Sequence, residues 1–120
     1  MINKYILNGC RDEGFSEDDM YGAYKIFFGT LVSESRLKML NLLQGSRKNV
    51  SQIMKSLGMS QTAVSHDLAR LKKCGFVQSA VEGPYRYYSI NESTIKPLLE
   101  IIVKHMGKHC THILKAGRRQ

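Results

Sequence analysis

The 120-residue sequence lacks the features of a membrane protein, a secreted protein or an enzyme. No stretch approaches 18 consecutive apolar residues, and the N-terminus has no basic, apolar and small-residue pattern of a secretory signal. The three cysteines, Cys10, Cys74 and Cys110, are odd in number and widely spaced, which argues against a disulfide framework. Paired carboxylates, a nucleophile–base pair and a glycine-rich phosphate loop are all missing. We therefore expect a cytoplasmic protein that is not an enzyme and has no membrane partner.

Positive charge is what the chain has in excess, with a net value of +8 at pH 7. Residues 1–19 hold two basic and five acidic side chains, a net −3. The other 101 residues hold 16 Lys and Arg against 5 Asp and Glu, a net +11. A domain this basic attracts polyanions, and nucleic acid ranks ahead of an anionic membrane because no amphipathic anchor is evident. Solubilising lysines would give the same charge, so charge alone leaves the partner open.

Periodic apolar segments predict a mainly α protein with a small β-hairpin wing, in the order α-α-α-α-β-β-α. Side chains able to cap the first four helices are Ser16, Ser33 or Ser35, Ser51 and Ser60. Residues 76–81 and 85–90 are rich in β-branched and aromatic side chains and flank a Glu-Gly-Pro turn. The last helix begins at Asn91, Ser93 or Thr94, with Pro97 in its first turn.

This order is that of a winged helix-turn-helix with an extra helix at each end. We expect an N-terminal arm over residues 1–15 and a single winged domain with dimerisation helices over residues 16–112. A basic C-terminal tail is expected over residues 113–120. One domain suits this length, because a chain of this size buries one cooperative core.

Residues 51–77 carry the specific signal, two helices joined by a tight turn that contains Gly58. On the second helix Val64, Leu68 and Leu71 fall on one side and face the core. Small polar side chains fall on the other side, and they suit base contacts better than they suit helix formation. The expected DNA-binding residues of this helix are Ser60, Gln61, Thr62, Ser65, His66, Arg70 and Lys73. Gln61 could form two bonds to adenine, and Arg70 or Lys73 could hold phosphate.

Over roughly residues 20–110 the chain resembles the ArsR/SmtB family of repressors. Residues 33–37 (SESRL) are similar to the family's Asp-Pro-Thr-Arg-Leu helix start, without the proline. Residues 60–68 (SQTAVSHDL) are similar to its Ser-x-x-Thr/Ser-x-Ser-x-His-Leu recognition helix, with His one position early. Residues 75–77 and 86–90 match the start of its first wing strand and its wing return.

The resemblance implies a repressor that binds a double-stranded DNA operator without needing a cofactor and leaves it when an effector binds. It implies a homodimer joined by the first and last helices, and the apolar last helix agrees with such a seam. A twofold dimer would bind a near-palindromic site. The resemblance also lays the wing on the DNA backbone, so that Arg86, with Lys48 or Lys55, touches phosphate.

Metal sensing is the effector hypothesis that the residues favour. The family's site on the third helix is absent, because residues 50–57 contain no Cys, His or acid. Its site on the last helix maps to Glu92, Thr94, His105 and Lys108, of which two can bind metal. However, His105, His109 and His112 share a helical stripe if the helix extends that far, an arrangement that collects zinc, nickel or cobalt. Further ligands could come from Glu92, Cys10 or Cys110.

Several alternatives stay open. Histidines in a dimer seam are often merely packed, and tail histidines are often only solvated. A thiol switch could use Cys10 and Cys110, or the effector could be organic, a protein or nonexistent. A winged-helix module for protein–protein contact would show an apolar or acidic fourth helix, whereas this one is small, polar and basic. Non-specific compaction of nucleic acid would need the charge but not the groove-reading residues.

Overall fold

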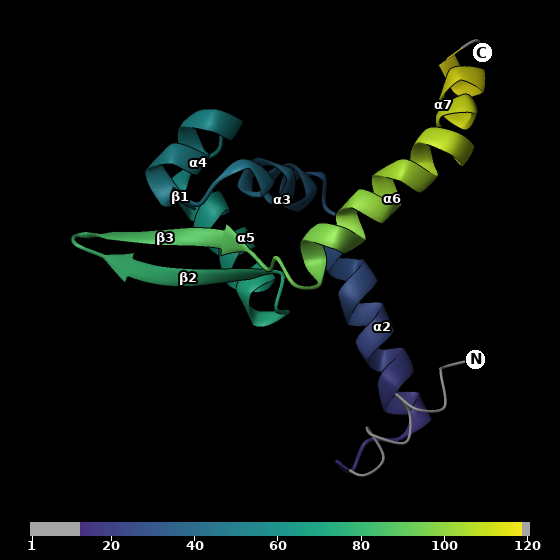
Figure 1. The fold of residues 1–120 in the computed structure, drawn as a ribbon, viewed down its shortest axis with the longest axis horizontal. Coiled ribbons are helices and arrows are strands. Elements are labelled where there is room, and N and C mark those ends of the chain that lie inside the picture. The colour runs from purple at the N-terminus through teal and green to yellow at the C-terminus, as the bar shows by residue number, and fades with distance from the viewer. Residues whose placement is uncertain (1–12, 119–120) are drawn as a thin grey trace.

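The structure, a computed structural model, describes residues 13–118. Its elements are α2 (Glu17–Leu31), α3 (Glu34–Gly45), β1 (Lys48–Asn49), α4 (Val50–Leu57), α5 (Gln61–Lys73), β2 (Val77–Glu82), β3 (Tyr85–Ile90), α6 (Ile95–His109) and α7 (Thr111–Arg118). The predicted order of four helices, a hairpin and a further helix is confirmed (Figure 1). The short strand β1 and the final helix α7 are additions that the sequence pattern did not predict.

Three predicted helix starts are confirmed. Ser16, Ser33 and Ser60 each precede a helix, and each hydroxyl accepts a hydrogen bond from the backbone N–H three residues on. Ser33, rather than Ser35, caps α3. These bonds satisfy backbone donors that the first helical turn leaves without partners.

The start of α2 is a reciprocal capping box. The Asp19 carboxylate accepts from the Ser16 N–H at 2.8 Å, and the Ser16 hydroxyl accepts from the Asp19 N–H at 3.2 Å. The bond from the Ser16 backbone, reinforced by the Ser16 side chain, holds the pKa of Asp19 below its ordinary value of 3.8. Because the pKa of Asp19 is lower in the folded than in the unfolded protein, this cap stabilises α2 at pH values above the unfolded pKa. The stabilisation is lost as the pH falls through the folded pKa.

The predicted start of α4 at Ser51 is wrong. Asn49 caps this helix, because its side-chain oxygen accepts from the Gln52 backbone N–H at 2.9 Å. The Gln52 side-chain oxygen in turn accepts from the Asn49 backbone N–H at 2.9 Å. Ser51 lies inside the first turn. The helix ends as predicted at Gly58, whose φ of 64° is a left-handed conformation that glycine adopts without strain.

The sheet has three antiparallel strands in the order β1-β3-β2. The hairpin pairs Val77 with Ile90 at its base and Glu82 with Tyr85 at its tip. Between them Gly83 turns the chain with a φ of 61°. β1 adds only the pairs of Lys48 with Tyr88 and of Asn49 with Tyr87. Two residues are too few to show strand alternation, so β1 exists because the hairpin offers it an edge.

The core lies between α3, α4, α5 and the base of the hairpin. Its buried apolar side chains are Met39, Leu40, Leu43, Ile53, Val64, Leu68, Leu71, Phe76, Val77, Ile90, Ile95 and Leu99. α2 joins this core through Phe27, whose ring stacks on Phe76 with centroids 5.0 Å apart. Because α5 is held by its apolar side, its opposite side faces outward.

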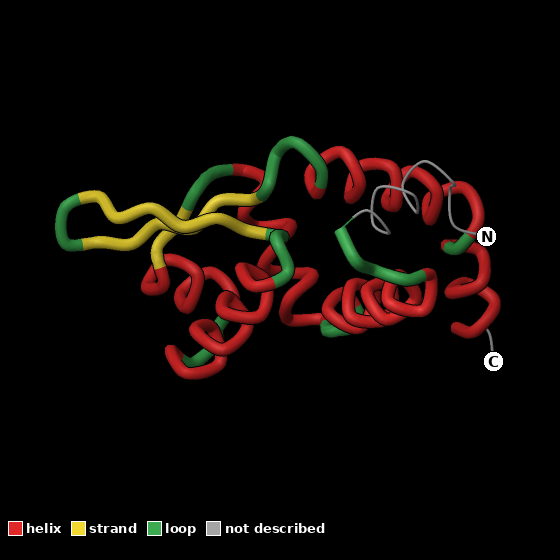
Figure 2. Tube along the Cα trace, turned by 90° about the horizontal axis from the view of Figure 1, so that it is seen from below, coloured by secondary structure: helices red, strands yellow, loops and turns green. Residues whose placement is uncertain are grey.

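The end helices α2, α6 and α7 leave the body on the side opposite the hairpin tip, as both views show (Figures 1 and 2). α6 has Pro97 in its first turn as predicted, and it ends at His109 before Cys110. α7 then runs to Arg118, so the expected boundary between residues 112 and 113 falls inside a helix. Most of the expected arm, residues 1–12, lies outside the described residues. Over residues 13–118, no helix combines the length and apolarity needed to cross a bilayer.

Candidate nucleic-acid interface

α4, the turn at Gly58 and α5 form the helix-turn-helix that residues 51–77 predicted. On α5 the side chains of Val64, Leu68 and Leu71 are buried, as the helical pattern predicted. The exposed residues of the first two turns are Ser60, Gln61, Thr62, Ser65 and His66. The structure therefore brings these five predicted contacts together on one end of a single outward-facing helix.

Most polar side chains on this face do not bond to other parts of the protein. Among the described residues, no hydrogen bond or ion pair is formed by the side chains of Gln61, Thr62, Ser65 or His66. Ser60 differs, because its hydroxyl caps α5 by accepting from the Ala63 N–H at 3.1 Å. Donors and acceptors that are exposed and free are available to base edges in a major groove.

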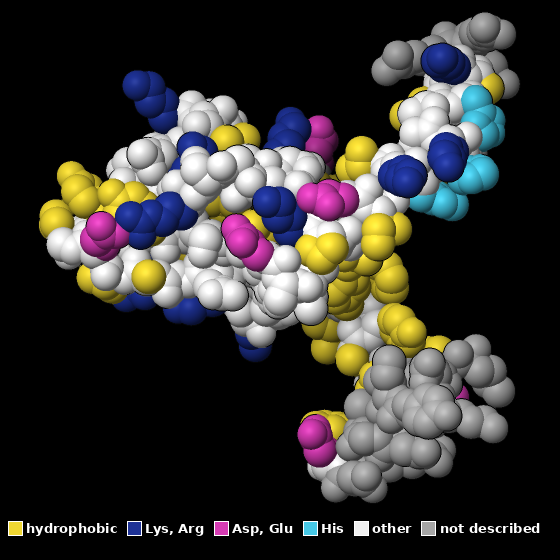
Figure 3. All heavy atoms as spheres, in the orientation of Figure 1, with side chains coloured by type: hydrophobic (Ala, Val, Ile, Leu, Met, Phe, Trp, Pro, Cys, Tyr) yellow, Lys and Arg dark blue, Asp and Glu magenta, His cyan; other side chains and the backbone are white. Residues whose placement is uncertain are grey.

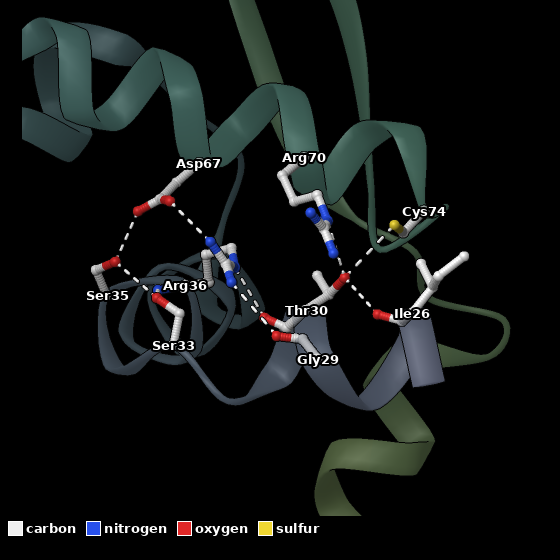
Figure 4. Close-up of polar contacts among 9 residues, drawn as sticks. All are labelled: Ile26, Gly29, Thr30, Ser33, Ser35, Arg36, Asp67, Arg70 and Cys74. Carbon is white, nitrogen blue, oxygen red and sulfur yellow. Dashed lines mark hydrogen bonds and ion pairs between the residues drawn. The ribbon is translucent and has the colours of Figure 1, made fainter. Parts of the chain in front are cut away.

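Arg70 lies away from this face. Its Nε donates to the hydroxyl of Thr30 on α2 at 3.1 Å (Figure 4). The Thr30 hydroxyl is fully buried, donates to the Ile26 carbonyl at 2.8 Å and lies 3.6 Å from the sulfur of half-buried Cys74. Arg70 therefore links α5 to α2. Lys73, one turn further on, is exposed and makes no ion pair with the described residues.

An ion pair that sequence reasoning missed joins α3 to α5. Arg36 Nη1 lies 3.3 Å from Asp67 Oδ1, and the two side chains are only 17% and 9% exposed. The Ser35 hydroxyl donates to Asp67 Oδ2 at 2.7 Å, and Arg36 Nε donates to the Thr30 carbonyl at 2.8 Å (Figure 4). One signal could have revealed it. Asp67 falls among the apolar positions of α5, where an acid needs a partner, and it stands where the resembled family has histidine.

Three basic side chains, Arg47, Lys48 and Arg86, lie on the three-stranded sheet or directly before it. Arg86 is exposed on β3, and its Nη1 donates to the Ser79 hydroxyl across the hairpin at 3.3 Å. Lys48, on β1, lies 3.2 Å from the Ser46 hydroxyl. Arg47 is less free, because it pairs with Glu82 and stacks 4.4 Å from the centre of the Tyr87 ring. Arg86 and Lys48 form no ion pair with the described residues, so both charges on the sheet are free to meet an anion.

The predicted metal ligands are only partly brought together. The rings of His105 and His109 lie on one side of α6 with centroids 4.7 Å apart. His112 follows the break at Cys110 and belongs to α7. Glu92 precedes α6, and a helix rises 1.5 Å per residue, so within one chain it stands about 15 Å or more from His105. Residues 13–118 contain no group of three His, Cys, Asp or Glu able to hold an ion.

The thiol pair cannot be placed in the same way. Cys110 is half-buried at the junction of α6 and α7, whereas Cys10 lies outside the described residues. The hypothesis of a switch between these two cysteines therefore stays a prediction.

The end helices expose an unusual amount of apolar surface (Figure 3). Large apolar side chains that are at least 41% exposed are Tyr21, Tyr24, Ile26 and Phe28 on α2, Val32 directly after it, Ile101, Val103 and Met106 on α6, and Leu114 on α7. Tyr24 and Phe28 stack with ring centroids 6.2 Å apart. Exposed apolar surface on this scale is typical of a protein–protein interface.

An outward-facing recognition helix, an adjoining three-stranded sheet with exposed basic residues and helical ends with apolar surface define a winged helix-turn-helix DNA-binding regulator. The model of the bacterial regulatory proteins of the ArsR family matches residues 33–79. The chain is 32% identical to the transcriptional regulator MJ1325 of Methanocaldococcus jannaschii, over 57% of this chain and 78% of that one. It is 28% identical to ArsR2 of Halobacterium salinarum, a protein named as an arsenical resistance operon repressor. That match covers 83% of this chain and 85% of the relative.

A solved structure agrees with these sequence matches. The homodimeric winged helix-turn-helix DNA-binding domain Mb0332 of Mycobacterium bovis superimposes with a TM-score of 0.74 at 26% identity, covering 80% of this chain and 89% of that one. The chain belongs to the ArsR family of transcriptional regulators. The family resemblance and the expectation of a regulator rather than an enzyme are thereby confirmed.

Proposed function

We propose that the protein is a homodimeric, sequence-specific repressor that reads its operator with the first two turns of α5. One observation carries the proposal: Gln61, Thr62, Ser65 and His66 are exposed on one helix end and unused inside the described part of the chain. Threonine, serine and histidine at positions 62, 65 and 66 are weaker helix formers than the residues that an ordinary surface helix prefers. Their donors and acceptors match the groups that a major groove presents.

Two further features support the proposal. Arg86 and Lys48 lie on the sheet beside α5, where cations would contact the phosphate backbone. The apolar surface of α2 and α6 would join two copies, as in the homodimeric relative from Mycobacterium bovis. Two reading helices then face two half-sites, which raises both affinity and specificity.

Replacing Thr62 or His66 by alanine is expected to weaken operator binding about 5- to 150-fold, because each lost base contact is worth about 1–3 kcal/mol. Binding to unrelated DNA should not change. The measurement is fluorescence anisotropy on a duplex that the wild-type protein selects from a random-sequence pool. Thr94→Ala is the matched control, since Thr94 is exposed before α6 and its side chain makes no capping bond. Wild-type affinity in both α5 variants would show that another surface reads the bases.

Replacing Arg86 by alanine should instead lower affinity for all duplexes alike, because a phosphate contact carries no sequence information. The slope of log K against log salt concentration should fall by about 1. Lys38→Ala on α3 is the control, because Lys38 already pairs with Glu34 on the surface. An unchanged salt slope in the Arg86 variant would remove the wing from the interface.

A metal-responsive form of this function is favoured by the proximity of His105 and His109. Two imidazoles with ring centroids 4.7 Å apart supply half of a tetrahedral zinc site, which needs four donors. α6 also carries part of the apolar surface, so a twofold dimer could bring in the same pair from the second copy. His112, or Glu92 or Cys10 of the second copy, could serve instead. DNA binding itself requires no metal in this proposal.

Zinc is expected to bind the apo-dimer with micromolar or tighter affinity and to weaken operator binding about 5- to 150-fold, the range of typical couplings. Calorimetry followed by anisotropy on the operator measures both. A variant with His105, His109 and His112 replaced by alanine should lose both effects, whereas the control His66→Ala should keep zinc binding. Affinity weaker than micromolar, or zinc binding without any change in operator affinity, would contradict metal sensing at this site.

A further inference from the structure

A cleft of about 540 Å³ lies between α2 and the C-terminal turn of α5, away from the helix end proposed to read bases. Its lining residues are Ala23, Ile26 and Phe27 from α2, Arg70 and Lys73 from α5, and Cys74. One wall is therefore apolar and the other carries two positive charges. A volume in this range, mainly apolar walls and a few converging polar groups are characteristic of sites for small organic molecules.

The two cations are not neutralised. Only Nε of Arg70 is engaged, by the Thr30 hydroxyl, and no other nitrogen of Arg70 or Lys73 forms a hydrogen bond or ion pair with the described residues. The nearest acid along α5, Asp67, is occupied by Arg36 and Ser35. Two free positive groups at one end of an apolar cleft complement a negative group on an apolar molecule.

Acidic residues next to the cleft favour one orientation of such a molecule. A neighbouring hollow of about 510 Å³ shares Ala23 and Ile26 with the cleft but is lined by Glu13, Asp18 and Asp19. Like charges repel, so an anionic group is driven from this acidic end of α2 toward Arg70 and Lys73, and the apolar body lies along Ile26 and Phe27.

Dimerisation through the proposed surface leaves the cleft open. Of the exposed apolar residues, Tyr21, Tyr24 and Phe28 follow one stripe of α2 at spacings of three and four residues, and Val32 continues it directly after the helix. Ile26 lies off this stripe. Ala23, Ile26 and Phe27, which line the cleft, follow another stripe. At 100° per residue these stripes lie on nearly opposite sides of the helix. A partner subunit that packs on the stripe of Tyr21, Tyr24 and Phe28 therefore does not fill the cleft.

We propose that this cleft binds a small organic anion, an apolar aromatic or aliphatic body with one carboxylate, and that binding weakens operator affinity. The carboxylate pairs with the free nitrogens of Arg70 and with Lys73. Pairing with the carboxylate draws the Arg70 guanidinium away from Thr30 and so loosens the link between α2 and α5, and it neutralises positive charge on α5. The effect on DNA rests on the proposed repressor function, whereas the binding site does not.

The probe is 2-naphthoate, titrated by calorimetry into the metal-free protein. We expect a Kd of about 100 µM or tighter, a modest efficiency for a ligand of this size. Neutral 2-naphthalenemethanol should bind at least about tenfold more weakly, and Arg70→Gln or Lys73→Gln should weaken naphthoate binding by a similar factor. Lys72→Gln is the matched control, because Lys72 lies on the other flank of α5 and does not line the cleft. Equal binding of the neutral alcohol, or naphthoate binding that survives both glutamine substitutions, overturns the site.

The steric variant Ala23→Leu fills the cleft from an exposed position of α2 and should abolish naphthoate binding. It should still bind the operator, and its helix content is checked by circular dichroism. Saturating naphthoate should weaken operator binding of wild type and Lys72→Gln about fivefold or more, with no effect on Ala23→Leu. Naphthoate bound without a change in operator affinity overturns the regulatory role alone. Failure of wild type to select any operator would instead count against the proposed repressor.

Discussion

Replacing Asp67 by alanine is expected to lower the free energy of unfolding by about 3 kcal/mol. The Arg36 guanidinium would lose its only counter-charge among the described residues while remaining 83% buried at its side chain. Arg36 would keep its bond to the Thr30 carbonyl, but a backbone oxygen does not neutralise a buried charge. Urea denaturation followed by circular dichroism measures the loss.

The surface offers a matched control for this prediction. Lys38 and Glu34 form an ion pair at the same 3.3 Å, but their side chains are 62% and 84% exposed. Glu34→Ala should cost no more than about 1 kcal/mol, because an exposed pair gains little over solvation by water. The two substitutions therefore separate burial from distance. Equal losses in both variants would contradict the role assigned to burial.

A double-mutant cycle measures the interaction energy between Arg36 and Asp67 separately from the other effects of each substitution. Arg36→Met combined with Asp67→Leu removes both charges and keeps apolar volume, so the double variant should be more stable than the sum of the single losses allows. Strict additivity would show that Arg36 and Asp67 do not interact in solution. The pair matters for DNA binding because Asp67 follows His66 directly and holds the middle of α5 against α3.

Replacing Phe28 by glutamate is expected to convert the protein to a monomer at micromolar concentration. Phe28 is 55% exposed, stacks on Tyr24 and lies on the apolar stripe of α2, and its ring meets that of Phe27 edge to face with centroids 5.3 Å apart. A carboxylate in an apolar interface loses its hydration without gaining a partner, so the dimer dissociation constant should rise about 100-fold or more. Analytical ultracentrifugation measures it directly.

Operator affinity should fall with the dimer, by about two orders of magnitude, because two half-sites bound by linked modules bind far more tightly than one. Two controls isolate the cause. Phe28→Leu keeps an apolar side chain and should remain dimeric, while Asn41→Asp adds the same charge at an exposed position of α3. A wild-type protein that is already monomeric, or a dimeric Phe28→Glu variant, would contradict the assignment of α2 to the interface.

Local features of this protein were predictable from the sequence because they depend on near neighbours in the chain. The Ser60 cap and the turn at Gly58 involve residues no more than four positions apart, and the apolar spacing of Val64, Leu68 and Leu71 set the buried side of α5. The exposed polar side of α5 followed from the same spacing. The start of α4 was missed by two residues, since Asn49 and Ser51 both have side chains that can cap and only the reciprocal bond with Gln52 selects one.

Contacts between distant residues were decided by the tertiary structure alone. Arg36 meets Asp67 across 31 positions and Arg70 meets Thr30 across 40, and no local pattern brings such pairs together. The sequence placed Arg70 among the phosphate contacts because its wheel position flanks the polar face, but α2 lies beside that flank and takes its Nε. The two-residue strand β1 likewise exists only because β3 pairs with it. Helix periodicity determines which way a side chain points, whereas the packing of helices determines what it meets there.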